Sequence, residues 1–378
     1  MPMYHTDDQA MLKDSASPFI AEAGPVAHLR SLRDSNDPTG FSRDLWKQFA
    51  EMGFTGILVP EDKGGLGLGH VEAGIVLEEI GRNLTPSPFL TTAVAAASAL
   101  KAAGGAVADE WLPRIAAGDA VIALAIDESQ RHRPERVALK AERSGNGFRL
   151  SGTKTFVLNG HVADMLLVAA RTAGAAGEES GITLFAVPRD AAGLSADPRR
   201  LVDSSIASKL TLDGVEVTAD AVVGEVDAGW SALKPLLAAA RTGASAELLG
   251  VGQGAMDMTM TYLKQRKQFG RLIGEFQSLQ HRAAHLYSEM EIARSCVMKA
   301  QQLLDEGNDG AELMVSVAKA KVGQTTNLAV REGVQMHGGI GMTDEYDIGL
   351  YMKRDRALAE FMGDVNYHTD RVARMNGY

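Results

Sequence analysis

Residues 262–282 read YLKQRKQFGRLIGEFQSLQHR, and this stretch interrupts a long helical pattern in the C-terminal part of the chain. A helix is expected to end near Gly270, and the turn is expected to expose Arg266, Gln268 and Phe269. An arginine beside backbone N–H donors suits a diphosphate, and an aromatic ring can stack on a planar ligand. Taken alone, such residues more often form a solvated basic turn.

Two long helical patterns follow this turn. Apolar residues recur on one face from Leu286 to Leu304, through about five helical turns. GNDG at residues 307–310 then breaks the chain, and a second long helix follows it. Two such helices joined by a short turn favour an antiparallel bundle.

The second long helix ends in QMHGGIGMT, residues 335–343. Glycines after a helix permit close approach of the backbone to a ligand, and Gln335 could bind an amide edge. The glycines in question begin with Gly338 and Gly339. Alone this signal is weak, because glycine at a helix end is most often a simple C-cap.

Three compositional zones divide the chain. Residues 1–120 and 227–378 carry helical patterns, whereas residues 121–226 carry short apolar or alternating segments separated by turn residues. No long helical pattern interrupts the middle zone, so antiparallel strands in a barrel or sandwich fit better than βαβ units. The expected fold is therefore a multidomain α+β protein in the order α, β, α.

Local signals place several elements within these zones. Ser42 is a suitable N-cap for a helix that runs towards Gly53. VEAGIVLEEIGR, from Val71, is also helical, with Gly81 as its expected end. SGNG at residues 144–147 joins two strand-like segments as a hairpin turn would.

Composition excludes several classes of function. The chain has 38 basic and 48 acidic residues and a formal net charge of −10, which argues against a general nucleic-acid or anionic-membrane surface. Its opening lacks a secretory pattern, and no uninterrupted apolar stretch is long enough to span a bilayer. The single cysteine, Cys296, cannot form an internal disulfide. We therefore expect a cytoplasmic protein, with no nucleic-acid partner and no integral membrane segment.

Together the motifs resemble the acyl-CoA dehydrogenase family. RKQFGRLIGEFQSLQ and QMHGGIGMTDEYDIGLYMKRD resemble its C-terminal domain, LVPEDKGGLG and VLEEIGR its N-terminal domain, and LSGTKTFVLNG the strand beside the flavin. The resemblance implies an N-terminal helical domain (1–120), a middle β-domain (121–226), a C-terminal four-helix bundle (227–378) and a tetramer. It also implies FAD shared across a subunit interface. The residues that would bind the ADP half of a neighbour's FAD are Arg266, Gln268, Phe269, Gln277, Gln335, Gly338 and Gly339.

The resemblance has local departures. The flavin-facing strand of the family usually reads Trp-Ile-Thr-Asn, but this chain has Phe156, Val157, Leu158 and Asn159. Leu158 cannot donate the threonine hydrogen bond, whereas the ring of Phe156 could still cover the flavin. The family's Thr-Glu-Pro stretch is IDESQRHRPER here, from residue 126.

The resemblance also implies a carboxylate base that removes the α-proton of an acyl-CoA thioester while hydride passes to the flavin. The two family positions for this base hold Gly363 and Ala240 here. Glu247 lies seven residues beyond Ala240, about 700° further along a helix, and so faces nearly the same way. Its apolar neighbours would desolvate it, and Arg241 would orient it or a substrate group.

Alternatives to Glu247 as the base remain open at this stage. Asp364 follows the usual base position directly, and Glu247 could be a helix residue that pairs with an arginine. Ala-Glu-Leu-Leu-Gly around Glu247 is closest to the pimeloyl-CoA dehydrogenase small-subunit type. His281, His285 and Glu289 have a metal-like spacing, but the chemistry requires no metal and none is expected.

The expected partners are an acyl-CoA substrate, an electron-transfer flavoprotein, and a homotetramer or an α2β2 heterotetramer with a paralogous subunit. Two other functions remain open. The chain could be a non-catalytic or half-site subunit of a heterotetramer, or a flavin oxidase or monooxygenase on the same fold.

Overall fold

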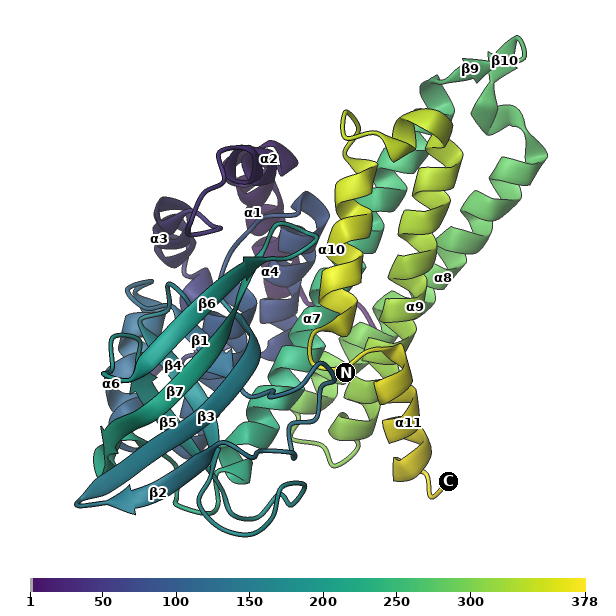
Figure 1. Cartoon of the computed structure of the whole chain (residues 1–378). Helices are drawn as coiled ribbons and strands as arrows, with labels where there is room; N and C mark the ends of the chain where they lie inside the picture. The colour runs from purple at the N-terminus through teal and green to yellow at the C-terminus, as the bar shows by residue number, and fades with distance from the viewer. Residues whose placement is uncertain (1–2) are drawn as a thin grey trace. The chain divides into compact units, whose positions relative to one another are not determined.

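The computed structural model describes residues 3–378, and Figure 1 shows the order of its helices and strands. The chain forms two compact units. The first, the helical unit, contains the residues up to Ser31, His70–Thr85 and Arg241–Tyr378. The second, the sheet unit, contains Leu32–Gly69 and Pro86–Ala240.

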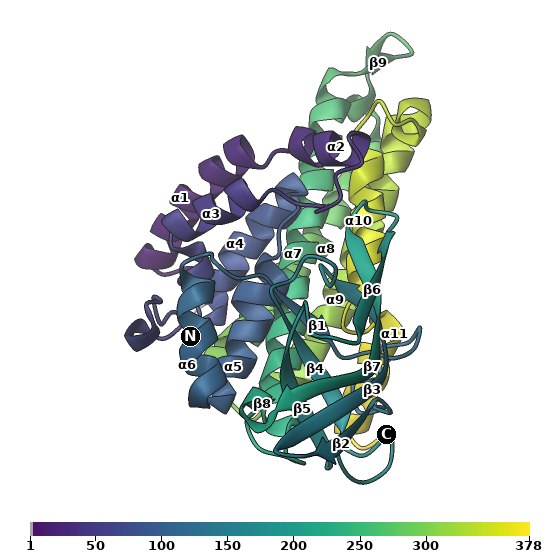
Figure 2. The same ribbon diagram turned by 60° about the vertical axis from the view of Figure 1, so that its left-hand side comes forward.

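The sheet unit is built on one eight-stranded sheet, whose strands Figure 2 shows from a second side. Its path runs β6-β7-β3-β2-β4-β5-β8, with β1 paired to β4. Most neighbours are antiparallel as predicted, but β1 pairs with β4 in parallel, and β2 meets β4 in parallel at Lys140 and Arg171. The strands are β1 (Ile122–Ala125), β2 (Lys140–Ser144), β3 (Gly147–Leu158), β4 (Met165–Arg171), β5 (Ile182–Pro188), β6 (Leu194–Arg200), β7 (Ile206–Thr218) and β8 (Val222–Val223).

Alternation and turn chemistry explain the central hairpin. β3 alternates buried and exposed residues near its start, as a strand with one solvated face does. Ser144 pairs with Gly147, so the SGNG turn forms the predicted hairpin between β2 and β3. β4 is buried along its whole length, which explains its continuous apolar sequence.

Short helices complete the sheet unit. α3 (Arg43–Glu51) begins at the predicted cap, where the Ser42 side chain accepts a hydrogen bond from Leu45 N. Its rings join an aromatic cluster in which Phe49 packs edge-on against Phe54 and Phe89. The other helical segments are η1 (Phe54–Gly56), η2 (Glu61–Lys63), the π-helical turn η3 (Leu90–Ala96), α5 (Ala97–Ala103), α6 (Gly105–Ala116) and η4 (Ala219–Ala221).

The helical unit contains the long helices that follow residue 241, and Figure 1 shows α7, α8, α9 and α10 running side by side. α8 and α9 are separated by the predicted break at residues 307–310. The helices are α1 (Asp7–Ala23), α2 (Val26–Asp34), which crosses the unit boundary, α4 (His70–Asn83), α7 (Trp230–Gln265), which begins in the sheet unit, α8 (Gln277–Asp305), α9 (Ala311–His337), α10 (Ile348–Glu360) and α11 (Val365–Met375). The short elements are β9 (Lys267–Gln268), β10 (Arg271–Leu272), η5 (Ile273–Glu275) and η6 (Gly338–Met342).

None of the helices formed by residues 3–378 combines the length and the apolar character that a membrane crossing needs.

Glycines bring α4 and α7 into direct backbone contact. A Cβ atom at Gly81 would lie 2.1 Å from the carbonyl oxygen of Glu247, and one at Gly250 would lie 1.9 Å from that of Glu78. The expected helix end at Gly81 is therefore wrong, because α4 continues to Asn83. Gly81 is a packing residue inside the helix, and it fixes α4 against the turn of α7 that carries Glu247.

Gly250→Ala is expected to lower the free energy of unfolding by about 1–3 kcal/mol, because the added methyl group forces α4 and α7 apart. Denaturant unfolding of the variant and the parent measures the change. Gly349→Ala is the matched control, since a Cβ there meets nothing within 4 Å and alanine favours a helix. Equal stability of Gly250→Ala and the parent would contradict the close contact.

Candidate active site

Glu247 lies on α7 in the interior of the helical unit, with 2% of its surface exposed. The expected desolvation is therefore present, and Ala244 and Leu248 beside it are fully buried. Thr326 of α9 donates its hydroxyl to the Leu248 carbonyl at 2.8 Å, which fixes this turn of α7 from a second side. The backbone of Glu247 thus lies between α4 and α9.

Arg354 of α10 binds the carboxylate of Glu247. Its Nε donates to Oε1 at 3.0 Å, and its Nη2 forms a second, shorter contact with the same oxygen. Arg354, which the sequence analysis did not single out, is the ion-pair partner of the candidate base. This contact agrees with the alternative in which Glu247 is a helix residue that pairs with an arginine, so Glu247 as the base stays a proposal.

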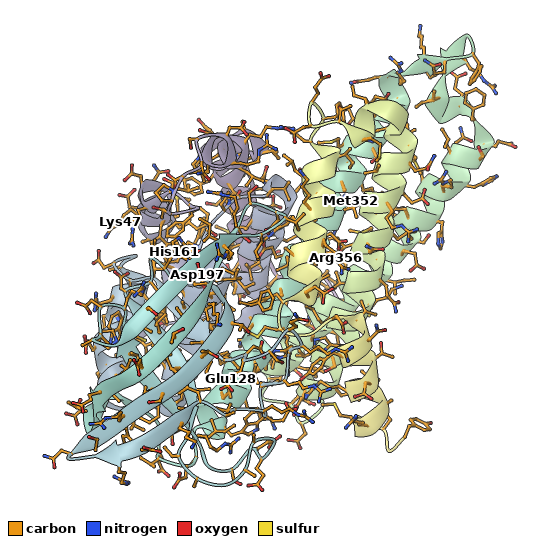
Figure 3. The ribbon with its side chains drawn as sticks, in the orientation of Figure 1. Lys47, Glu128, His161, Asp197, Met352 and Arg356 are labelled. Atoms are coloured by element: carbon orange, nitrogen blue, oxygen red, sulfur yellow. The ribbon has the colours of Figure 1, made fainter. Side chains whose placement is uncertain are left out.

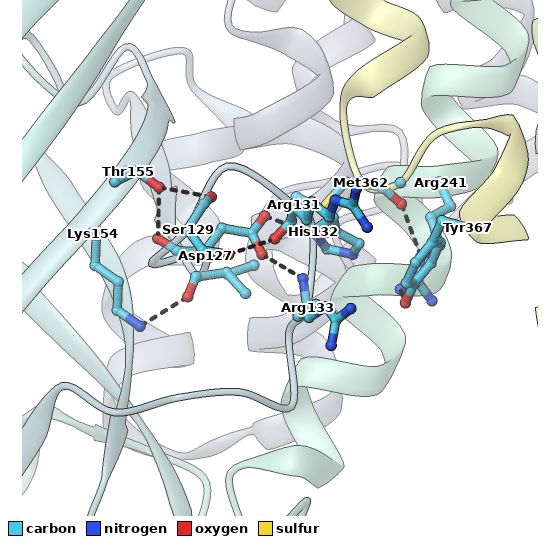
Figure 4. Close-up of polar contacts among 12 residues, drawn as sticks. Asp127, Ser129, Arg131, His132, Arg133, Lys154, Thr155, Arg241, Met362 and Tyr367 are labelled. Atoms are coloured by element: carbon cyan, nitrogen blue, oxygen red, sulfur yellow. Dashed lines mark hydrogen bonds and ion pairs between the residues drawn. The ribbon is translucent and has the colours of Figure 1, made fainter. Parts of the chain in front are cut away.

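Arg241, expected to orient Glu247 or a substrate group, contacts the C-terminal turn of the helical unit. It is 4% exposed, and its Nη2 donates to the hydroxyl of Tyr367 at 2.9 Å. Its Nε donates to the Met362 carbonyl at 3.4 Å. Figure 4 shows Arg241, Met362 and Tyr367 together at the C-terminal turn of the helical unit. The contacts connect α7 to the turn that carries Gly363.

Lys319 of α9 also forms hydrogen bonds with the turn that carries Gly363. Its Nζ, on a side chain 1% exposed, donates to the carbonyls of Ala359 at 2.9 Å and Gly363 at 3.1 Å. Burial lowers the pKa of Lys319 to about 7, and burial raises the pKa of nearby Asp355 to about 6.

Gly363 occupies a conformation that excludes a side chain. Its φ is +107°, and a Cβ atom there would lie 2.3 Å from Cδ1 of Tyr367. The ring of Tyr367 thus fills the space next to residue 363, one of the positions where the resemblance implies a base. The packing of the Tyr367 ring against residue 363 therefore requires glycine there and leaves no room for a carboxylate side chain.

Gly363→Ala is expected to lower the free energy of unfolding by about 1–3 kcal/mol, since the methyl group meets the Tyr367 ring and positive φ disfavours alanine. In a Tyr367→Ala background the loss should be smaller, because only the backbone strain and the approach to His368 Nε2, at 3.0 Å, remain. Thermal and denaturant unfolding of the four variants of this cycle measure the difference.

Gly307→Ala is the control for backbone strain alone, because Gly307 has a φ of +61° and open space at its Cβ. A loss at Gly363 no larger than that at Gly307, and unchanged by Tyr367→Ala, would contradict the packing account.

Asp364, the rival base, has a structural role. Its Oδ1 accepts a hydrogen bond from Tyr367 N at 2.7 Å, and it is the N-cap of α11. An N-cap carboxylate satisfies a backbone donor that the helix leaves unpaired. This contact gives Asp364 a structural role, as the contact with Arg354 does for Glu247.

The expected ADP-binding residues lie at one end of the helical unit and are all exposed. β9 and β10 form a hairpin whose tip is Phe269, with 91% of its surface exposed and a φ of +54°. A Cβ at Gly338 or Gly339 would meet nothing within 4 Å, which leaves open space for a ligand. The other exposed members of the set are Arg266, Gln268, Gln277 and Gln335.

An aromatic stack joins the two motifs. The ring of His337, at the end of α9, lies 4.4 Å from that of Tyr262 on α7 and 4.7 Å from that of Tyr346. His337 Nδ1 lies 2.7 Å from the Gly333 carbonyl, and burial lowers the pKa of His337. The neutral ring fixes the QMHGG turn beside the end of α7, so residues about seventy positions apart share one surface. The exposed residues of this surface, Arg266, Phe269 and Gln335 among them, have the chemistry to bind an adenine nucleotide.

The expected flavin-facing residues lie on β3 of the sheet unit. Phe156 is 56% exposed and has a φ of +53°, at a register shift where β3 bulges against β7. The bulge turns a large ring towards solvent, which fits a residue that covers a bound ring system. Leu158 is half-buried and pairs with Ala207.

The loop that contains IDESQRHRPER, from residue 126, is held by several side-chain contacts. Lys154 of β3, completely buried, donates to Glu128 Oε1 and to the Ile126 carbonyl, each at 2.8 Å. His132 Nδ1 lies 2.8 Å from Oδ2 of Asp127. Glu128 is labelled in Figure 3, and Figure 4 shows the contacts of Asp127 with its neighbours. The partners of Asp127 and Glu128 lie elsewhere in the loop and on β3, and no local sequence pattern predicts them.

No group of three potential metal-ligating side chains is present within residues 3–378. Of the metal-like set on α8, Glu289 pairs with Lys321 of α9, and this hydrogen bond lowers the pKa of Glu289.

One signal could have revealed Lys319 from the sequence. It lies in VSVAKAKVG on the same helical face as Val315 and Val322, which are both buried. A lone lysine on an apolar face indicates a buried amine with backbone or acidic partners. Tyr367 and Arg354 had no such signal, because their roles depend on contacts between distant helices.

Three sequence profiles of one family match almost the whole chain. The profile described as acyl-CoA dehydrogenase, N-terminal domain, matches residues 6–119. The middle-domain profile matches residues 130–215, and the C-terminal-domain profile matches residues 227–376.

Individual relatives extend over the same length. Acyl-CoA dehydrogenase FadE12 of Mycobacterium tuberculosis is 30% identical over 357 residues, which are 93% of this chain and 91% of that protein. Mitochondrial isovaleryl-CoA dehydrogenase of Solanum tuberosum is 30% identical over 378 residues, 98% of this chain and 89% of that protein. A chain in the ChsE4-ChsE5 complex from Mycobacterium tuberculosis superposes with a TM-score of 0.87 at 26% identity, over 100% of both chains.

Proposed function

Because the chain belongs to the acyl-CoA dehydrogenase family, we propose that Glu247 is the base that removes the α-proton of its substrate. The chain is an FAD-dependent oxidoreductase that desaturates an acyl-CoA thioester between its α- and β-carbons. FAD, when bound, supplies the acceptor for the β-hydride.

The observation that carries this assignment is the burial of Glu247, because the two positions where the resemblance implies a base hold Gly363 and Ala240. The carboxylate of Glu247 is buried, and Arg354 holds it in one orientation. The contacts of this turn of α7 with α4 and α9 fix the position of the Glu247 backbone. A general base needs a defined position and a free lone pair more than it needs mobility. Gly363 has no side chain, and Asp364 caps a helix.

The residues that would hold FAD follow from exposure and chemistry. We assign the ADP half, from a neighbouring subunit, to the hairpin and helix end that contain Arg266, Phe269 and Gln335. Phe156 would cover the flavin ring and Leu158 would line it. Arg241, through Tyr367, would keep the Gly363 turn in place beside the substrate.

The proposal extends to the substrate class and the partners. The Ala-Glu-Leu-Leu-Gly segment favours the pimeloyl-CoA dehydrogenase small-subunit type, and an electron-transfer flavoprotein would accept the electrons. We propose a cytoplasmic tetramer, either of one chain or of two paralogous chains.

A second function has a specific observation in its favour. A subunit that lends only the ADP-binding half of a site needs the exposed hairpin but no complete flavin strand, and Leu158 removes a side-chain donor from that strand. The similarity to a chain of the ChsE4-ChsE5 complex favours a two-chain assembly.

Purification of the chain alone and with its genomic neighbours separates the two functions. The flavin absorbance of each sample is recorded before and after anaerobic addition of straight-chain, dicarboxylic, branched and steroid acyl-CoAs. An active dehydrogenase bleaches with at least one thioester. Bleaching only in the presence of a paralogous chain would assign the half-site function, and no bleaching in any sample would refute both.

A further inference from the structure

A hydrogen bond between α9 and α10 lies next to the ion pair of Glu247 and Arg354. Asn327 of α9 donates its side-chain amide to Oδ2 of Asp355 at 3.1 Å. Asp355 directly follows Arg354 on α10. Thr326, the residue before Asn327, donates its hydroxyl to the carbonyl of the residue that follows Glu247 on α7. Adjacent residues of α9 therefore hold α7 and α10 at the two positions that follow the members of the pair.

Asp355 is a buried carboxylate that is only partly satisfied. It is 1% exposed, and within residues 3–378 its Oδ1 has no hydrogen-bond partner. Burial raises the pKa of Asp355 to about 6, while the amide of Asn327 and the ammonium of Lys319 favour its charged form. A buried polar atom without a partner costs stability. The position that this carboxylate gives to α10 therefore explains its presence better than a gain in stability does.

Lys319 fixes α10 to α9 a second time, further along both helices. Its Nζ donates to the carbonyls of Ala359 at 2.9 Å and Gly363 at 3.1 Å. Lys319 precedes Asn327 by eight residues on α9, whereas Ala359 follows Asp355 by four residues on α10. The two sets of contacts thus occur in antiparallel order along helices that run side by side in Figure 1. A shift or rotation of α10 against α9 would break at least one of them.

The rotation of α10 decides whether Arg354 meets Glu247. Nε and Nη2 of Arg354 both contact Oε1 of Glu247, so the guanidinium holds the carboxylate in one orientation. Side-chain groups lie about 5–6 Å from a helix axis, so a rotation of about 10° moves them by about 1 Å. An error of about 1 Å in the position of a reacting group can lower a rate about a hundredfold.

We propose that Asn327 and Asp355 are positioning residues for the reaction, whose hydrogen bond sets the rotation of α10 and thereby keeps Arg354 on Glu247. The inference rests on the proposed function, which assigns proton transfer to Glu247. Neither positioning residue needs to touch the substrate, because both act through Arg354. The side chain of Asn327 is exposed, so its truncation creates no cavity in the core.

Three variants separate the hydrogen bond from charge and from general effects on α9. Asn327→Ala removes the donor, whereas Asp355→Asn keeps an acceptor oxygen and removes only the charge. Gln324→Ala is the matched control, because Gln324 is an exposed amide one turn earlier on α9. The FAD-loaded proteins, with the paralogous chain where the flavin site requires it, are mixed anaerobically with an acyl-CoA that bleaches the parent. The dependence on acyl-CoA concentration gives the limiting rate and the dissociation constant.

Asn327→Ala is expected to lower the limiting rate about ten- to hundredfold, while the dissociation constant of acyl-CoA stays within about twofold of the parent value. Asp355→Asn and Gln324→Ala should keep the rate within about threefold, because the hydrogen bond persists in both. The parent rate in Asn327→Ala, or a loss of affinity in place of rate, would overturn the proposal. An equal loss of rate in Asp355→Asn or in Gln324→Ala would overturn it as well.

A stability cycle tests the same contact without the reaction. Asn327→Ala is made in the parent and in Glu247→Gln with Arg354→Met, which lacks the ion pair. The midpoint of thermal unfolding should fall at least about twice as far in the parent, because only there does the hydrogen bond support the pair. Equal shifts would overturn the proposal. If the proposed function fails, no acyl-CoA bleaches the parent, or Glu247→Gln is bleached at the parent rate, while the stability cycle still shows the coupling.

Discussion

Glu247→Gln is expected to abolish the bleaching of bound flavin by acyl-CoA while FAD binding and the fold persist. Glutamine has the shape of glutamate, and its amide oxygen can still accept from Arg354, so packing between α4, α7 and α9 is kept. It cannot accept the α-proton. The reductive rate constant, measured by anaerobic stopped-flow mixing, should fall by about 10²–10⁴-fold or more.

Asp364→Asn is the matched control for this variant. Asparagine is as good an N-cap as aspartate, so α11 should remain intact and the rate of bleaching should stay close to that of the parent. Full activity of Glu247→Gln would refute its role as the base. A large loss in Asp364→Asn, with an active Glu247→Gln, would transfer the role to Asp364.

Arg266→Ala is expected to release FAD, so that the protein is recovered largely colourless after gel filtration. Arg266 is exposed at the base of the β9–β10 hairpin, and its own backbone accepts from Ile273 N at 2.9 Å, which fixes its position. Loss of a charge-assisted contact to a diphosphate should weaken binding by about ten- to hundredfold. The flavin-to-protein absorbance ratio and a fluorescence titration measure this.

Lys267→Ala is the control for charge in the same hairpin, since Lys267 is exposed one residue further along β9. It should retain FAD. A yellow Arg266→Ala protein, or equal losses in both variants, would count against a specific diphosphate contact at Arg266.

Periodicity and turn chemistry were sufficient to predict much of the fold. The cap at Ser42, the hairpin at residues 144–147 and the break between α8 and α9 are all confirmed. These features depend on neighbours in the sequence, so local patterns contain the necessary information. The domain boundaries at residues 120 and 226 stay predictions.

Contacts between distant segments account for what was missed. Gly81 resembles a helix end, but it lies inside α4 because α7 passes within backbone contact. The parallel pairing of β1 with β4 joins strands about forty residues apart, and no pattern in either strand specifies it. Both outcomes depend on tertiary packing, which overrides local preference.

In the candidate site too, features set by neighbouring residues were predictable, whereas contacts between distant segments were not. Burial of Glu247 followed from its apolar neighbours on α7, and exposure of Arg266 and Phe269 followed from the turn that contains them. The pairing of Glu247 with Arg354 could not be predicted from the sequence, because it joins residues 107 positions apart on α7 and α10.

Release of α-deuterium from a labelled acyl-CoA tests the central claim most directly. The FAD-loaded parent, Glu247→Gln and Asp364→Asn are incubated anaerobically with the α,α-dideuterated thioester, and the label lost to water is followed by mass spectrometry. The parent and Asp364→Asn should release deuterium at similar rates, and Glu247→Gln should release it at least about a hundredfold more slowly. Release by Glu247→Gln at the parent rate would show that another group removes the α-proton, and would contradict the assignment of Glu247 as the base.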